Sequence, residues 1–281
     1  MKKNFRSIEI TVKKLLNTFP TGGHVSSLKN SIIDVDVVRE YQPGDKRLDS
    51  RASLRTNSIM SRVFTPDKSM NVMLVLDVSC SQASKFESAI LVCLYLCYLA
   101  NQSNDPVGLT TFGDRVSLSI QPDEDIRNVT SVLEQIYYRG NLSPGSNLDD
   151  ALRRIGNQEP SNTLTVLVSD FCFPFSDRIV GLLRCISCGI NNVMIAPILA
   201  NSQEWSFDVL PFRVDFKDSE SNDATNWNFG SEKAHKGHLA AFEKWQTDLK
   251  AVLHQGRVEP ILMQVDKPDF MMPLVKFFLR A

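Results

Sequence analysis

The sequence of 281 residues lacks a hydrophobic run long enough to cross a membrane, and it lacks an excess of either charge. Its longest apolar run, Ala89–Ala100, has the length of a buried helix and is shorter than the roughly 20 residues of a membrane-spanning helix. The basic start, Met1–Arg6, is not followed by the apolar stretch of a signal peptide. A net charge of −1 excludes a general attraction to nucleic acids or anionic membranes. We therefore expect a soluble, cytoplasmic protein.

Cysteine and histidine are also scarce, with six Cys and four His in the chain. Cys93 and Cys97 lie four residues apart in an apolar segment, so both are expected to face the core. Cys185 and Cys188 have redox-motif spacing, but they come late in a predicted helix, where the helix dipole does not activate a thiol. A zinc site would need a second Cys or His pair at suitable spacing. Zinc and disulfide chemistry are therefore not expected.

The remaining composition, 43% hydrophobic and 22% charged residues, is ordinary for a globular protein. Apolar strand-like segments alternate with helical ones from Asn71 onward. The expected strands are 71–77, 107–112, 116–120, 164–169 and 193–198, and the expected helices are 83–101, 124–138, 148–155 and 177–186. This alternation predicts an α/β fold with a mainly parallel sheet covered by helices on both faces. The turn at Gly113-Asp114 predicts a hairpin that adds one antiparallel edge strand.

Two further regions flank this alternation, and we expect an N-terminal segment, 1–69, packed on a domain that spans 70–281. In the first region, 5–19 has helical spacing and 31–64 mixes short β-type patches with turns. In the tail, a polar loop or excursion is expected at 218–230. A helix–strand–helix extension follows, with a helical stripe at 239–253, a strand at 259–265 and a helix at 270–279.

The strand-like run Asn71–Leu76 leads directly into a carboxylate and two hydroxyls, Asp77, Ser79 and Ser81. Alternate residues of an extended chain share one side, so these three side chains are expected to face the same way. Carboxylates and hydroxyls are ligands that Mg²⁺ accepts, usually together with water. In the other interpretation, Ser79 and Ser81 cap the following helix while Asp77 complements its dipole. This stretch alone leaves both interpretations open.

Two distant segments favour the metal interpretation. Ser146 lies in a Gly-containing turn that enters a helix, and Asp170 follows the apolar strand expected at 164–169. Ligands of open parallel sheets bind outside the carboxyl ends of the strands, where Asp77 and Asp170 are expected to lie. Three separated segments therefore direct oxygen ligands towards one place.

This order of residues resembles the metal-ion-dependent adhesion site of von Willebrand factor A-like domains. The resemblance implies a Rossmann-like fold and a site of Asp77, Ser79, Ser81, Ser146 and Asp170 for Mg²⁺ or another divalent cation such as Mn²⁺. It implies direct contact of the three hydroxyls with the ion, while the two aspartates act through water or balance charge. Ser146 stands where the family usually has Thr, so the ligand oxygen is kept but the methyl that stiffens χ1 is lost.

Upstream, the run Arg39–Asp49 contains Tyr-Gln-Pro-Gly-Asp and is similar to the signature of the bacterial family called domain of unknown function fifty-eight. Ser50 stands where that family usually has Trp. Members combine such a segment with a von Willebrand A-like domain, often beside MoxR-type AAA+ ATPases. The resemblance therefore implies a non-catalytic adaptor or co-chaperone that binds a MoxR-type ATPase and its client proteins. The net charge and the lack of a long apolar run add the expectation of no nucleic acid and no membrane insertion.

Two other functions stay open at this stage. In one, Asp77 is the nucleophile of a metal-dependent phosphoryl transferase. Ser79 is a poor general acid for that reaction, and no phosphate-cradling Gly-Lys-Ser/Thr loop or Gly-x-Ser-x-Gly elbow is present. In the other, the basic residues between Arg39 and Arg62 bind nucleic acid, but Tyr41 is the one aromatic residue among them, and stacking of successive bases requires several. We also expect an independent apolar core, so that replacing Asp77 or Asp170 by Ala leaves a folded protein.

Overall fold

The computed structural model describes residues 4–18, 37–41, 50–56, 58–63, 70–140, 142–158, 162–173, 175–189, 192–201, 213–217, 224–228 and 232–280. Its centre is a six-stranded sheet in the order β10-β7-β6-β3-β4-β5. The strands are β3 (Asn71–Asp77), β4 (Val107–Phe112), β5 (Val116–Asp123), β6 (Thr163–Val168), β7 (Val193–Ala200) and β10 (Glu259–Gln264). Within this six-stranded sheet, β4 and β5 pair in antiparallel fashion and all other neighbouring strands pair in parallel. The predicted parallel α/β sheet with one antiparallel edge strand is confirmed.

The burial of each strand follows its place in the sheet. β4 and β6 are buried along their whole length, and β3 is buried after its first residue, as expected for strands with both faces covered. β5 is partly exposed, as an edge strand should be, and its polar side chains pair with its neighbour. The hydroxyls of Thr110 and Ser119 lie 3.1 Å apart across the two strands.

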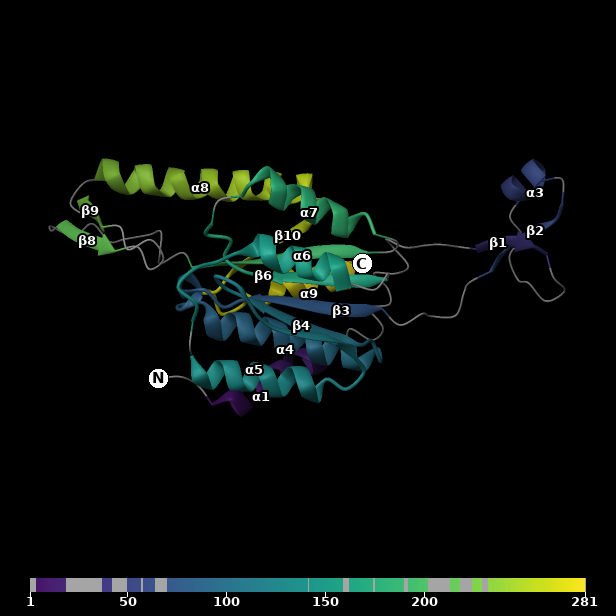
Figure 1. Cartoon of the computed structure of the whole chain (residues 1–281), viewed down its shortest axis with the longest axis horizontal. Coiled ribbons are helices and arrows are strands. Elements are labelled where there is room, and N and C mark those ends of the chain that lie inside the picture. The colour runs from purple at the N-terminus through teal and green to yellow at the C-terminus, as the bar shows by residue number, and fades with distance from the viewer. Residues whose placement is uncertain are drawn as a thin grey trace.

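Helices cover both faces of the sheet (Figure 1). One layer contains α1 (Phe5–Thr18), α4 (Phe86–Gln102), α5 (Arg127–Arg139) and α9 (Met272–Arg280). The other contains α6 (Leu148–Gln158), α7 (Asp177–Ser187) and α8 (Glu232–Gln255). Cys93 and Cys97 of α4 are completely buried, which confirms that both face the core, and none of the six cysteines, all of which the structure describes, forms a disulfide.

The N-terminal helix α1 packs on the sheet domain through an apolar stripe. Phe5, Ile8, Val12 and Leu16 are buried in the same cluster as the side chains of α4. A hydrogen bond of 2.7 Å from the Tyr98 hydroxyl to Glu9 Oε1 adds a polar contact between the two helices. The expectation of a packed N-terminal segment therefore holds for this helix.

A second N-terminal unit contains the antiparallel pair β1 (Val37–Glu40) and β2 (Met60–Val63) with α3 (Ser50–Thr56). Figure 1 shows this unit standing apart from the sheet rather than packed on it, which differs from our expectation. Two apolar side chains of the unit stay uncovered, with Leu54 86% and Ile59 62% exposed. The family-like run Arg39–Asp49 lies outside the described residues from Gln42 onward.

The tail is more integrated than predicted. The polar loop expected at 218–230 contains β9 (Ala224–Asn228), which pairs with β8 (Arg213–Lys217) as an antiparallel ribbon. The predicted extension completes the main sheet, because β10 pairs in parallel with β7 and α9 buries Leu274 and Phe278 in the core. In the part of the chain that the structure describes, no helix combines the length and apolar character needed to span a membrane.

Candidate metal centre

Asp77 ends β3 and is completely buried at the carboxyl edge of the sheet. Two hydrogen bonds hold its carboxylate in place. Oδ1 accepts the backbone N–H of Ser79 at 2.9 Å, and Oδ2 accepts the Ser169 hydroxyl at 2.7 Å. Burial raises the pKa of Asp77 from 3.8 to about 6, although these hydrogen bonds oppose the rise. The chain therefore keeps an oriented carboxylate in a site that disfavours its charge.

Ser79 and Ser81 follow directly, where the chain leaves the strand for the short 3₁₀ helix η1 (Cys80–Gln82). Ser79 is extended, and its side chain makes no hydrogen bond that would cap the helix. Its hydroxyl instead lies 3.0 Å from the hydroxyl of Ser81. The helix-capping interpretation is therefore wrong for Ser79, whereas the predicted placement of both hydroxyls on one side is confirmed.

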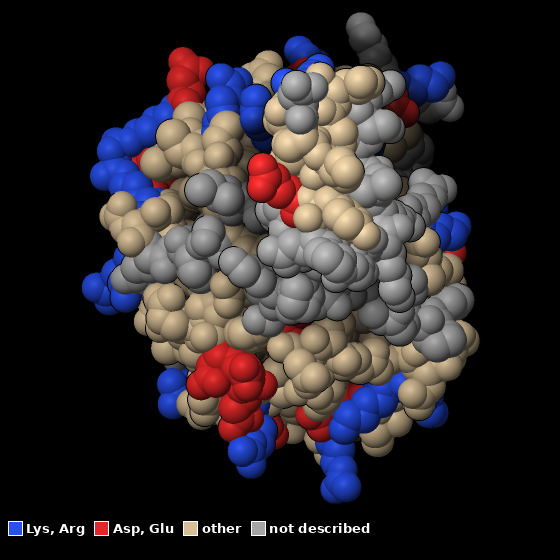
Figure 2. Space-filling model, turned by 90° about the vertical axis from the view of Figure 1, so that its right-hand side faces the viewer, with Lys and Arg blue, Asp and Glu red and all other residues tan. Residues whose placement is uncertain are grey.

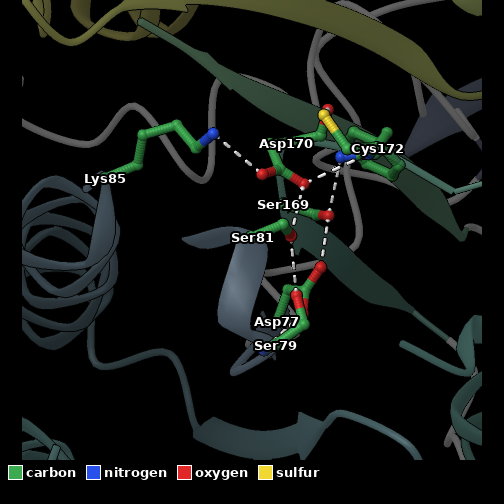
Figure 3. Close-up of polar contacts among 8 residues, drawn as sticks. Asp77, Ser79, Ser81, Lys85, Ser169, Asp170 and Cys172 are labelled. Atoms are coloured by element: carbon green, nitrogen blue, oxygen red, sulfur yellow. Dashed lines mark hydrogen bonds and ion pairs between the residues drawn. The ribbon is translucent and has the colours of Figure 1, made fainter. Parts of the chain in front are cut away.

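Asp170 comes from the neighbouring strand end, just after β6, and is 1% exposed. Its Oδ1 accepts the backbone N–H of Cys172 at 3.1 Å and the Ser81 hydroxyl at 3.4 Å, which links the two strand ends. Its Oδ2 lies 2.9 Å from Nζ of Lys85, whose side chain is 3% exposed (Figure 3). Asp170 is thus the carboxylate of a buried ion pair.

The turn after Asp170 is built on an unusual backbone conformation. Phe171 has a φ of 54°, in the left-handed region that large side chains avoid. Its N–H donates to the Ser169 hydroxyl at 2.9 Å, and its ring is buried beside Phe173 and Phe175. These contacts stabilise a conformation that carries Ser169 towards Asp77 and keeps Asp170 at the site.

The loop that carries Ser146 is attached to the same edge on both sides. Before Ser146, the N–H of Ser143 donates to Val78 O at 2.7 Å, and Ser143 O accepts the N–H of Cys80 at 2.8 Å. After it, the N–H of Asn147 donates to Gly113 O at 2.6 Å. A Cβ on Gly113 would overlap the Ser143 side chain, so this close approach requires glycine.

The structure brings four of the five predicted residues into one hydrogen-bonded group, Asp77, Ser79, Ser81 and Asp170. Ser146 lies on the adjoining loop without joining that group, because its buried hydroxyl makes no hydrogen bond among the described residues. A buried polar atom without a partner is costly and suggests an absent ligand. Mg²⁺ accepts such oxygen donors, so these residues fit a small divalent cation.

The donor set is dominated by hydroxyls. Within the described segments, no three His, Cys, Asp or Glu side chains gather in a way that could hold a metal ion. The described residues therefore form neither a Cys/His cluster of the kind that binds zinc nor a carboxylate cluster of the kind that binds calcium.

Sequence reasoning missed two residues of the centre, Ser169 and Lys85. Ser169 directly precedes Asp170, so its position at a strand end could have indicated that it lies in the centre. Lys85 carried a weaker signal, a lone basic residue that directly precedes the long apolar helix α4. Its ion pair with Asp170 also changes the expectation for Asp170→Ala, because that substitution would leave a buried ammonium group without this partner.

Comparisons with known proteins identify a family and two distant structures. Residues 37–241 match the family described as "Protein of unknown function DUF58". The conserved hypothetical protein BatB from Bacteroides thetaiotaomicron has 13% sequence identity, covers 75% of this chain and 100% of its own, and has a TM-score of 0.45. An aerotolerance-related membrane protein from Bacteroides fragilis NCTC 9343, with multiple mutations to serines, has 15% sequence identity and a TM-score of 0.43. The match covers 75% of this chain and 100% of that protein's chain. No curated protein matches the chain.

Proposed function

The chain belongs to the family of proteins of unknown function DUF58, and we propose that it is a metal-dependent protein-interaction module without catalytic activity. In this proposal the α/β domain is von Willebrand A-like, and its carboxyl edge carries a metal-ion-dependent adhesion site. The site consists of Asp77, Ser79, Ser81, Ser146 and Asp170.

One observation carries the proposal. Oxygen-bearing side chains of two neighbouring strand ends are hydrogen-bonded at one edge of the sheet, and the loop attached to this edge carries Ser146, whose hydroxyl is buried without a hydrogen-bond partner among the described residues. A purely structural network would be expected to satisfy that hydroxyl, since an unpaired buried polar group costs about 1–3 kcal/mol. A cation at this edge would satisfy it.

The chain's own residues have distinct roles in this site. Ser79, Ser81 and Ser146 would provide neutral oxygen donors, while Asp77 and Asp170 would provide negative charge. Bound Mg²⁺ would supply an electrophilic centre that attracts an acidic side chain of a partner. The partner that we propose, from the family resemblance, is a MoxR-type AAA+ ATPase, with this protein as its adaptor towards client proteins.

The arrangement of Asp77 weighs against the phosphoryl-transfer alternative. A nucleophilic carboxylate must reach its substrate, yet Asp77 is completely buried and both of its oxygens accept hydrogen bonds. Nucleic-acid binding has no specific support either. Figure 2 shows basic and acidic side chains interspersed on the described surface of the face that it presents, rather than a continuous basic patch.

The test is a binding assay between the full chain and a MoxR-type ATPase, with Mg²⁺ or with a chelator. We expect binding only with the metal, and we expect Ser146→Ala to weaken both metal and partner binding. Ser187→Ala is a matched control, because Ser187 is also partly buried but its hydroxyl bonds to Leu183 O on α7. Equal recovery of the ATPase with chelator would contradict the proposal.

A further inference from the structure

Lys85 occupies a position that is unfavourable for a cation in two respects. Its side chain is 3% exposed, so the ammonium group has lost most of its hydration. It also directly precedes the first residue of α4, where the helix dipole repels positive charge. The ion pair of 2.9 Å with Asp170 compensates for these costs, since a buried charge is tolerated only when it is paired.

The same carboxylate belongs to the candidate metal centre. Oδ2 of Asp170 faces Lys85, while Oδ1 faces Ser81 and the backbone of Cys172 (Figure 3). A divalent cation at the serine hydroxyls would therefore share Asp170 with an ammonium group of like charge. Such repulsion between close charges inside a protein is strong, because little water screens it.

We propose that Lys85 is an internal cation that competes with the metal for Asp170. While no metal is bound, Lys85 neutralises Asp170 and keeps the site assembled, and a divalent ion gains that carboxylate only by weakening the ion pair. This inference rests on the proposed metal function and adds the residue that sets its affinity. Lys85 thereby makes the site a weak one that is responsive to metal concentration, and it makes the fold independent of the metal.

The experiment measures Mn²⁺ binding by titration calorimetry, and thermal melting with and without Mn²⁺, for the full chain and for Lys85→Met. We expect the variant to bind Mn²⁺ at least about tenfold more tightly, because the competing charge is gone. Without Mn²⁺ the variant should melt below the wild type, since Asp170 has lost its counterion. Mn²⁺ should then raise the melting temperature of the variant more than that of the wild type, in line with the tighter binding.

Three further variants provide a substitute for Lys85→Met and two controls. Lys85→Gln retains a hydrogen-bond donor for Asp170 and serves if Lys85→Met does not fold; it should also bind Mn²⁺ more tightly. Lys85→Arg retains the charge and should bind Mn²⁺ as the wild type does. Lys250→Met removes an exposed lysine of α8 and controls for the change in net charge.

Each outcome separates this inference from the proposed function. Equal or weaker Mn²⁺ binding by Lys85→Met and Lys85→Gln overturns the inference and leaves the metal function standing. Binding by these variants alone supports the inference and overturns the metal function of the native chain. No binding by any form overturns both, because Lys85 would have no metal to compete with.

Discussion

At the scale of single residues, the centre is a balance of buried charges. Asp77 and Asp170 each carry a carboxylate that is almost completely buried, and Lys85 provides an opposite charge for Asp170 only 2.9 Å away. Asp77 is instead held by the backbone of Ser79 and the hydroxyl of Ser169. The two carboxylates should therefore respond differently to substitution and to pH.

Asp170→Ala should destabilise the protein, because it leaves the ammonium group of Lys85 buried without this counterion. Breaking a buried pair by removing one partner typically costs about 3–5 kcal/mol. Urea unfolding measures the loss in the free energy of unfolding. Arg127→Ala is the control, since the ion pair of Arg127 with Asp125 is exposed and should matter little. Similar stabilities of the two variants would show that the buried pair does not act as described.

Asp77 should make the free energy of unfolding depend on pH. Its pKa in the folded protein, about 6, is above the ordinary 3.8, so the folded state binds the proton more tightly than the unfolded state. Stability is therefore greatest below about pH 4 for this group and falls as the pH rises through about 6. The rise in pKa corresponds to about 3 kcal/mol, with desolvation as its main cause.

Asp77→Asn should remove this pH dependence, because the amide is neutral throughout. We expect the stability of the variant, relative to the wild type, to increase by up to about 3 kcal/mol between pH 4 and pH 7. Urea unfolding at several pH values in the presence of a chelator measures it. Parallel pH profiles for the two proteins would mean that Asp77 titrates in the folded state as it does in water.

At the scale of elements, substitutions in the last helix, α9, test whether the C-terminal tail is part of the core. Leu274 of α9 is completely buried, whereas Leu279 of the same helix is 45% exposed. Leu274→Ala should cost about 2–5 kcal/mol through lost burial and a cavity. Leu279→Ala, the same chemical change, should cost about 0.5 kcal/mol or less. Equal melting temperatures for the two variants would show that α9 is only an appendage.

The ribbon β8–β9 and the six-stranded sheet form by different means. The sheet strands are apolar runs with both faces covered, whereas the sequence around β9 is polar and rich in turn residues. The strand at Ala224–Asn228 exists through backbone pairing with Arg213–Lys217. Such pairing leaves little trace in hydrophobic periodicity, which is why this segment was predicted as a loop.

At the scale of the whole molecule, the two N-terminal units differ in their attachment. α1 is buried against α4, while β1, α3 and β2 stand apart from the sheet (Figure 1). The chain passes from the second unit into β3 at Asn71, the end of that strand opposite to Asp77. The candidate metal centre and this unit therefore lie at opposite edges of the sheet.

Replacing residues 37–63 by a short Gly-Ser linker should leave the α/β domain folded. The sheet and both helix layers lie outside that segment, so their burial is unchanged. Circular dichroism and the melting temperature measure the outcome, and Mn²⁺ binding should persist because the centre is at the other edge. An unfolded product would show that the unit packs on the sheet and is part of one cooperative structure.

The sequence by itself determined the elements of the sheet domain and the local order of the centre. The length of the apolar run separates buried strands such as β3 from buried helices such as α4, because both are almost continuously apolar but β3 has 7 residues and α4 has 17. The spacing of Asp77, Ser79 and Ser81 likewise indicated that they lie close together, although Ser81 reaches Ser79 from the 3₁₀ helix η1 and not from extended chain. The parallel topology then follows from the strand–helix alternation, and it brings Asp170 to the same edge.

Only the tertiary structure decided which charges meet there and which segments pack. Lys85 and Asp170 are far apart in the chain, and their contact depends on how α4 and the turn after β6 are placed around β3. The turn itself depends on Phe171, whose left-handed backbone is stabilised by its buried ring. The detached position of β1 and β2 was likewise hidden, because a local pattern of strands and turns does not specify what they pack against. Burial and long-range pairing are properties of the assembled chain, so local sequence indicated Asp170 but neither Lys85 nor the contact between them.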